Sequence, residues 1–299
     1  MSALDAAEHA LLTGPPADSI PALQLVIDRD TNAVDRRIAQ WLIGVALGAT
    51  GRYGEAWSVL DPLRHDDDVV AALAGATAAS LHRQISEHED ARVLDVVALE
   101  VLTASPLVDR SPEALADVLI GLAADAVGVG DGDEAGRQLA AAQRVVANRR
   151  TGWRGKVRLE WVRAEIALLC GDSSAAFAAG QRAVAGARAA KAQRHVAKSL
   201  MFQGVAQVGV GDLEGASETL GMAATLAEAL GVVPLVWPSN LVLARVLVDL
   251  DRPVEAQACE AKVAAALTVI RSHLPQEVGD RWLAREEVHK AHHHGALDG

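Results

Sequence analysis

Four cationic side chains recur at regular spacings in the middle of this sequence. Arg154 and Arg158 are four residues apart, as are Arg194 and Lys198, and the second pair follows the first after 40 residues. Residues four apart lie on one face of a helix. Guanidinium and ammonium groups gathered in this way could hold a carboxylate or phosphate through charge-assisted hydrogen bonds. The spacing predicts an anion-binding patch, and an equally weighted alternative is a solvated basic face that pairs with the chain's own acids.

The charge of the chain is unevenly distributed. The 299 residues carry a formal net charge of −11, but the segment 137–198 holds 13 basic and 3 acidic residues. That segment is therefore +10 and the rest of the chain −21. An acidic protein with a basic middle segment is expected to bind an anionic partner there, or to pair the segment with its acidic flanks.

The helices that must position these cations are indicated by a repeated turn. Three similar turns occupy Cys170–Ala176, Val210–Ala216 and Leu250–Ala256, with 40 residues between successive alanines. A fixed period of this size is typical of stacked helical hairpins. Hydrophobic residues make up 51% of the chain and aromatic residues only 3%, because alanine is abundant. Alanine favours helix, so the sequence predicts an all-α fold.

The pattern divides the chain into three parts. Residues 1–31 are expected to form N-terminal helices, residues 32–276 the repeat array, and residues 277–299 a capping helix and tail. We expect a right-handed α-solenoid of about six helix-turn-helix hairpins, with a less regular stretch over 66–130. A cap is expected because the last repeat would otherwise expose an apolar face, and Trp282 is expected to pack on that repeat.

Other groupings of polar residues are better explained by structure than by chemistry. Three aspartates at 66–68 are interpreted as a helix cap, and the glycine-rich stretch 128–133 as a hairpin turn rather than a phosphate or calcium loop. His289, His292 and His293 could share one helical face and bind a divalent metal, but a solvated terminus is the preferred interpretation. No metal and no cofactor is predicted.

Two hairpins match one residue pattern closely. Each has a small residue in its first helix, a glycine turn, and then an alanine and a leucine in its second helix: Gly44, Gly51, Ala56 and Leu60, and again Gly204, Gly211, Ala216 and Leu220. Over residues 32–290 the chain resembles the tetratricopeptide repeat family. Its period exceeds the usual 34 residues and is similar to that of the sensor regions of large bacterial ATP-dependent transcription regulators.

This resemblance implies a scaffold rather than a catalyst. The function expected from it is a non-enzymatic interaction, sensor or adaptor module that binds an acidic peptide, a protein segment or a small anion in a basic concave groove. In this family type the first helices face the groove, which places Trp41 and Trp161 on that side. Arg158 and Lys198 occupy a position matching the basic residues of carboxylate-binding grooves. The residues expected to bind the partner are Arg154, Arg158, Trp161, Arg194, Lys198 and Arg245.

Two other function classes stay open. A regulatory factor could contact nucleic acid through 137–198, although the net charge of −11 and the lack of aromatic residues among the arginines argue against it. An enzyme on a helical scaffold is the other alternative, but no acid–base pair stands out. Cys170 and Cys259 are expected to be reduced thiols in the cytoplasm, and no signal peptide or membrane span is expected.

Overall fold

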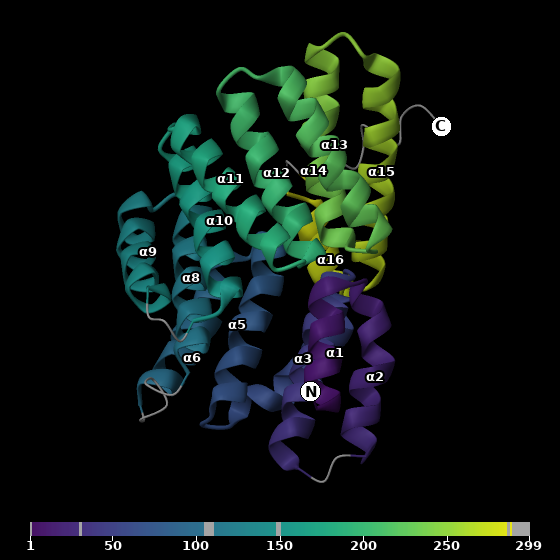
Figure 1. Cartoon of the computed structure of the whole chain (residues 1–299). Coiled ribbons are helices and arrows are strands. Elements are labelled where there is room, and N and C mark those ends of the chain that lie inside the picture. Colours follow the sequence, from purple (N-terminus) through teal and green to yellow (C-terminus); the bar gives the residue numbers. More distant parts are fainter. Residues whose placement is uncertain (1, 30–31, 105–110, 148–150, 286–287, 289–299) are drawn as a thin grey trace.

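All regular structure in the described part of the chain is helical. The computed structural model describes residues 2–29, 32–104, 111–147, 151–285 and 288, and contains no strand within them. Helices stack in antiparallel pairs along the chain (Figure 1). The prediction of an all-α solenoid is confirmed. The C-terminal histidines from His289 onward lie outside the described residues.

Six hairpins form the array, preceded by the pair α1 (Ala3–Thr13) and α2 (Pro16–Arg29) within the described chain. Their first helices are α3 (Ala33–Ala49), α5 (Val69–Gln84), α8 (Pro112–Gly128), α10 (Trp153–Leu169), α12 (Gln193–Gly209) and α14 (Val233–Asp249). Their second helices are α4 (Tyr53–Leu60), α6 (His88–Thr103), α9 (Gly132–Val146), α11 (Ser173–Ala189), α13 (Leu213–Ala229) and α15 (Pro253–Ser272). A 3₁₀ turn, η1 (Asp61–His65), follows α4, and α16 (Gln276–Leu283) follows α15.

The repeated turn has one conformation throughout the array. In the second to last of these turns, Gly211 has φ +82° and the amide of Asp212 donates to the carbonyl of Gln207 at 3.0 Å, which is the Schellman helix ending. The Asp212 carboxylate then accepts from the amide of Gly215 at 3.0 Å and caps the next helix. Glycine followed by aspartate suits both roles and recurs at 130–131 and 171–172, whereas the other turns have a different residue at one or both positions. The equivalent positive-φ residues are Gly51, Ser86, Gly130, Gly171, Gly211 and Asp251.

Small residues in the first helices let the second helices pack closely. A Cβ atom on Gly44 would lie 2.5 Å from a methyl carbon of Leu60, and one on Gly204 would lie 2.6 Å from Cγ of Leu220. Both leucines are completely buried. The glycine in the first helix therefore accommodates the leucine of the second, as the repeat pattern predicts.

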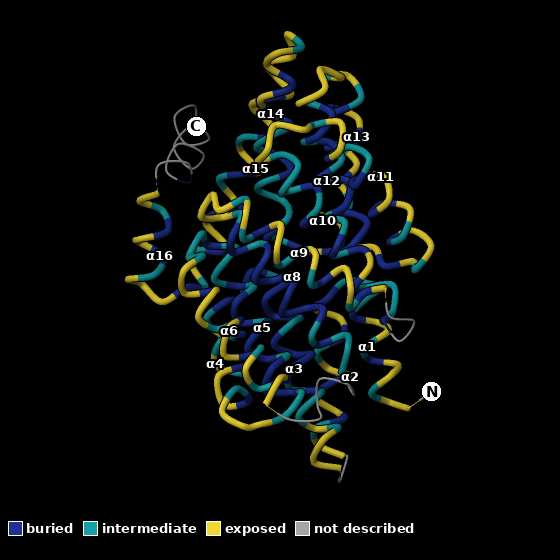
Figure 2. Tube along the Cα trace, turned by 90° about the vertical axis from the view of Figure 1, so that its left-hand side faces the viewer, coloured by how far each residue is buried: buried dark blue, intermediate teal, exposed yellow. Residues whose placement is uncertain are grey.

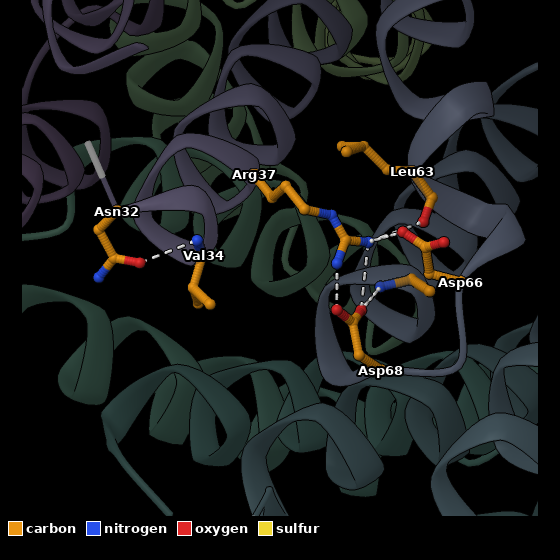
Figure 3. A network of polar contacts seen from close by, with 7 residues as sticks. Asn32, Val34, Arg37, Leu63, Asp66 and Asp68 are labelled. Atoms are coloured by element: carbon orange, nitrogen blue, oxygen red, sulfur yellow. Dashed lines mark hydrogen bonds and ion pairs between the residues drawn. The ribbon is translucent and has the colours of Figure 1, made fainter. Parts of the chain in front are cut away.

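The aspartates at 66–68 have structural partners. Asp68 caps α5 by accepting from the amide of Ala71 at 2.9 Å. Arg37 on α3 forms ion pairs with both Asp66 and Asp68 and also reaches the carbonyl of Leu63 (Figure 3). This cluster ties the start of the second hairpin to the first.

The two ends of the array meet. The amide of Gly54 in α4 donates to the carbonyl of His273 at 2.8 Å, and Arg281 of α16 forms an ion pair with Glu87 at 2.9 Å. Trp282 is 1% exposed and belongs to an apolar cluster that contains residues of the last repeat, such as Leu267, together with N-terminal residues such as Tyr53. The terminal helix therefore covers the last repeat and also joins it to the first.

The closed array surrounds an interior. A Cβ atom on Gly51, directly after α3, would lie 3.5 Å from Cβ of Val233 in α14, and neighbouring first helices contact one another from α3 to α14. The six first helices therefore form a ring in the order α3, α5, α8, α10, α12 and α14. Helix α1 contacts both α3 and α12. Buried positions lie toward the centre of the trace and exposed positions along its outer edges (Figure 2). None of the described helices is long and apolar enough to cross a membrane.

Candidate functional site

A cavity of about 320 Å³ lies inside the ring of first helices. All six first helices contribute to its lining, and among the described residues of the second helices His88 at the start of α6 alone does so. Ligand sites in proteins begin at about this volume. The cavity is thus the size of a small ligand or of the end of a chain.

The structure brings five of the six residues expected to bind the partner into this cavity: Arg154, Arg158, Trp161, Arg194 and Lys198. They come from α10 and α12, whose equivalent positions lie side by side because the repeats stack. Arg245 does not join them and is exposed. Helix α14 reaches the cavity only at its N-terminal end, through Pro234 and Leu235, so residues further along it point elsewhere.

Two of the cations share a single carboxylate. Arg158 Nη1 lies 2.6 Å from Asp117 Oδ1, and Arg154 forms an ion pair with the other oxygen of Asp117. The side chain of Asp117 on α8 is only 4% exposed. Burial lowers the pKa of Arg158, while Asp117 opposes that shift. Arg154 and Arg158 therefore pair with an acid from outside the basic segment, as the alternative interpretation expects. The single carboxylate of Asp117 nevertheless faces two guanidinium groups.

The other two cations have no carboxylate partner in the described chain. Arg194 makes no hydrogen bond or ion pair with a described residue, and burial beside Arg154 and Arg158 lowers its pKa to about 10. Lys198 Nζ lies 4.8 Å from the ring centroid of Trp161 and 5.7 Å from that of Phe202. Burial lowers the pKa of Lys198 to about 8, although Glu165 favours its charged form. Both groups stay charged at neutral pH.

Aromatic rings support this pair of cations. The His195 ring stacks on Trp161 at 5.3 Å and meets the edge of Trp153 at 4.8 Å. The indole nitrogen of Trp161 donates to Ser199 Oγ at 2.8 Å. His195 is 2% exposed, its Nδ1 has no hydrogen-bond partner, and burial among cations lowers its pKa well below the usual value. A neutral imidazole with one unused nitrogen therefore lies beside Arg194.

A second charged cluster, formed by Arg83 and two aspartates, was not expected from the sequence. Arg83 Nη1 of α5 lies 2.6 Å from Asp95 Oδ2 and 2.9 Å from Asp125 Oδ1. Asp95 is completely buried. Burial raises the pKa of Asp95 to about 7, with Asp125 adding to the shift and Arg83 opposing it. Here one cation faces two carboxylates.

The remaining wall is largely apolar. Trp41, Val45 and Leu73 line it from α3 and α5, and the indole nitrogen of Trp41 donates to Thr77 Oγ1 at 2.9 Å. Glu165 also lines the cavity without an ion pair to a described residue, and burial raises its pKa while Lys198 opposes the shift.

Sequence reasoning missed Arg83, Asp117, Glu165 and His195 as cavity residues. Their helices could be predicted, but Arg83 and Asp117 precede the regular 40-residue spacing and have no matching partner in the later repeats. His195 had a usable signal, because it directly follows Arg194 on a helix already expected to face inward.

One group of side chains has metal-ligand composition. Among the described residues, His82, Glu87 and Asp90 have donor atoms within 4.8 Å of one another. His82 Nδ1 lies 2.8 Å from one Glu87 oxygen, and Arg281 contacts the other. Because Arg281 of α16 already pairs with Glu87, this group is interpreted as part of the contact between α16 and the second hairpin.

Comparison with known proteins supports the fold. No protein-family model matches this sequence, and no curated protein matches it significantly. Among solved structures, a Rap protein complexed with competence and sporulation factor is similar, with a TM-score of 0.63 and 11% identity over 98% of this chain and 94% of that one. The aspartyl phosphate phosphatase F of Bacillus subtilis has a TM-score of 0.52 and 10% identity, covering 98% of this chain and 81% of that one. The chain therefore has a tetratricopeptide-like helical-repeat fold.

Proposed function

We propose that this protein is a non-enzymatic binding module that holds an anionic ligand, either an acidic peptide segment or a small anion, in its central cavity. The observation that carries the proposal is the excess of cations on α10 and α12. Arg194 has no carboxylate partner among the described residues, Lys198 has only the electrostatic attraction of Glu165 without an ion-pair contact, and Arg154 and Arg158 share one carboxylate. A bound anion would supply the missing negative charge.

The energetics favour a ligand rather than a structural role for these two cations. Arg194 and Lys198 are half-buried. A charge partly withdrawn from water without a partner destabilises the folded state, and neighbouring like charges add to that effect. Such an arrangement is retained in a protein when something compensates it. Hydrogen bonds to charged groups contribute about 1.5–3 kcal/mol each, so one anion contacting both side chains could offset the unfavourable terms.

The fold is compatible with this function. The similar Rap structure is named for its complex with competence and sporulation factor, and ligand binding inside a helical-repeat superhelix would use the concave surface typical of such proteins. The resemblance to sensor regions of bacterial transcription regulators would make the ligand a signal and this chain its receptor. Its partner would be acidic.

A direct test compares two variants of equal charge change. Arg194→Gln with Lys198→Gln alters the cavity, whereas Arg188→Gln with Lys156→Gln alters exposed positions of α11 and α10. Protein purified gently from its host lysate would be analysed by native mass spectrometry, and the retained compounds released by denaturation.

We expect the wild type and the surface variant to retain an acidic compound or peptide that the cavity variant loses. Retention should persist at moderate salt, because partly buried pairs are screened less than exposed ones. Equal retention by both variants, or retention of neutral or basic compounds only, would contradict the proposal. Release of a chemically converted product would instead favour an enzyme.

A further inference from the structure

The cavity has two unlike walls. In the ring order of the first helices, α3 and α5 lie across from α10 and α12. Helices α10 and α12 supply the cations, whereas Trp41, Val45 and Leu73 come from the facing helices. Arg83 is the one cation on the α3–α5 side of the described lining, and its charge is neutralised by Asp95 and Asp125. One wall therefore has the cations in excess over Glu165, and the other has apolar side chains together with the uncharged polar residues Thr77, Ser80 and Gln84.

The cationic wall has hydrogen-bond donors that no described carboxylate uses. A guanidinium has five N–H donors and an ammonium three, and Arg194 and Lys198 direct none of theirs to a described carboxylate. The buried Nδ1 of His195, between them in sequence, also lacks a partner. That nitrogen has almost no accessible surface, so the donors available for the charged end of a ligand are those of Arg194 and Lys198.

The aromatic residues present hydrophobic surface to the cavity rather than polar atoms. The indole nitrogens of Trp41 and Trp161 are used by Thr77 and Ser199. The Trp161 ring already contacts Lys198 and His195. The Trp41 ring, together with Val45 and Leu73, offers apolar surface to a ligand, and aromatic faces pack well against another ring.

We propose that the ligand is an amphipathic carboxylate, with its carboxylate bound by Arg194 and Lys198 and a ring-sized apolar body packed toward Trp41. The inference rests on the proposed function and specifies its ligand. A cavity of about 320 Å³ suits one such group. A free organic acid and the C-terminal residue of a peptide offer the same chemistry, so both are possible sources.

The test uses matched pairs of small molecules. A set of ring-bearing carboxylic acids that includes 3-phenylpropionate would be compared with the primary amide of each acid, and with acetate. Acetylated tetrapeptides ending in phenylalanine, with a free or an amidated C-terminus, form the second arm. Binding would be measured by ligand-observed NMR and by the fluorescence of the protein's tryptophans, two of which line the cavity.

We expect ring-bearing acids or free-carboxylate peptides to bind at least about tenfold more tightly than their amides and than acetate. Arg194→Gln should weaken the best of them about tenfold or more, and the exposed control Arg188→Gln should not. The arm that gives the tighter binding identifies the source.

Other outcomes separate this inference from the proposed function. If acetate binds as tightly as the ring-bearing acids, the proposed apolar part of the ligand is contradicted, whereas anion binding in the cavity is supported. If the amides bind as tightly as the acids, recognition of a carboxylate by Arg194 and Lys198 is contradicted, and so is the proposed function. If no acid and no peptide binds, the inferred ligand class is rejected.

Discussion

Two regions of the cavity wall contain arginine, one of them Arg83 alone, and they differ in how many carboxylates their arginines contact. Arg83 has two, Asp95 and Asp125. Arg154 and Arg158 share one, Asp117, and Arg194 next to them has none among the described residues. The first group is a neutralised, structural cluster, whereas the second keeps an excess of positive charge. Residue type alone does not distinguish Arg83 from the other three arginines, whereas the number of carboxylate partners does.

The largest effect is expected when the neutralised cluster loses its cation. Arg83→Met should lower the free energy of unfolding by about 3–5 kcal/mol, because two buried carboxylates lose the charge that compensates them. Urea denaturation would measure the change, with the exposed Arg92→Met as the control. Adding Asp95→Asn and Asp125→Asn to Arg83→Met should recover much of the loss. A variant as stable as wild type would remove the distinction between the two clusters.

A smaller loss is expected from Asp117→Asn. The variant leaves Arg154 and Arg158 beside each other without their carboxylate, and we expect about 1–3 kcal/mol of destabilisation. Affinity for a carboxylate ligand should rise, because two further guanidinium groups become available to it. Calorimetric unfolding with and without the ligand would show both effects, and Asp133→Asn on the exposed side of α9 is the matched control. A fall in affinity would show that Asp117 positions the arginines for binding.

The opposite sign is expected for Arg194→Gln. Removing a cation that lacks a partner should leave the free energy of unfolding unchanged or raise it by up to about 1 kcal/mol, while ligand binding weakens. This combination, greater stability with lost binding, is the behaviour of a functional site. A substantial loss of stability would mean that Arg194 has a structural role like that of Arg83.

The smallest effect concerns pH. Because the pKa of Lys198 is lowered to about 8, its charge is lost as pH rises from 7 to 9, and carboxylate affinity should fall by about tenfold or less. Lys198→Met should remove this dependence. In the unfolded chain the same group titrates near 10.5 and binds more protons between pH 8 and 10.5, so its contribution to the free energy of unfolding rises with pH there. Titrations followed by tryptophan fluorescence would detect both trends.

Much of the fold could be predicted because the turn requires particular residues. Gly211 supplies a positive φ, Asp212 caps the following helix, and the same pair recurs at 130–131 and 171–172. The turn at Ser86 shows why the front of the array was harder to assign, since a serine adopts the same positive φ there without a sequence signal. Glycine at that position would be expected to relieve strain.

The site was only partly predictable. Arg154, Arg158, Arg194 and Lys198 share a face because stacked repeats preserve the spacing of 40 residues. The ion pairs of Asp117 with Arg154 and Arg158 join α8 to α10, and Asp117 does not follow the 40-residue spacing, so the sequence does not predict them. Arg245 lies outside the cavity because α14 reaches it only at its N-terminal end. Periodicity specifies which face of a helix points inward, but not which charges meet there.

The contact between the last helices and the first repeats changes how this protein is expected to fold. An open array is stabilised by neighbours alone, so repeats can form and unfold piecemeal. Here Arg281 pairs with Glu87 across 194 residues of sequence, and Trp282 is buried in a cluster shared with the first repeat. Contacts between distant segments slow folding, and they couple repeats that would otherwise melt independently. The ring should therefore unfold as a single cooperative unit, and its number of repeats cannot change by one without separating the two ends.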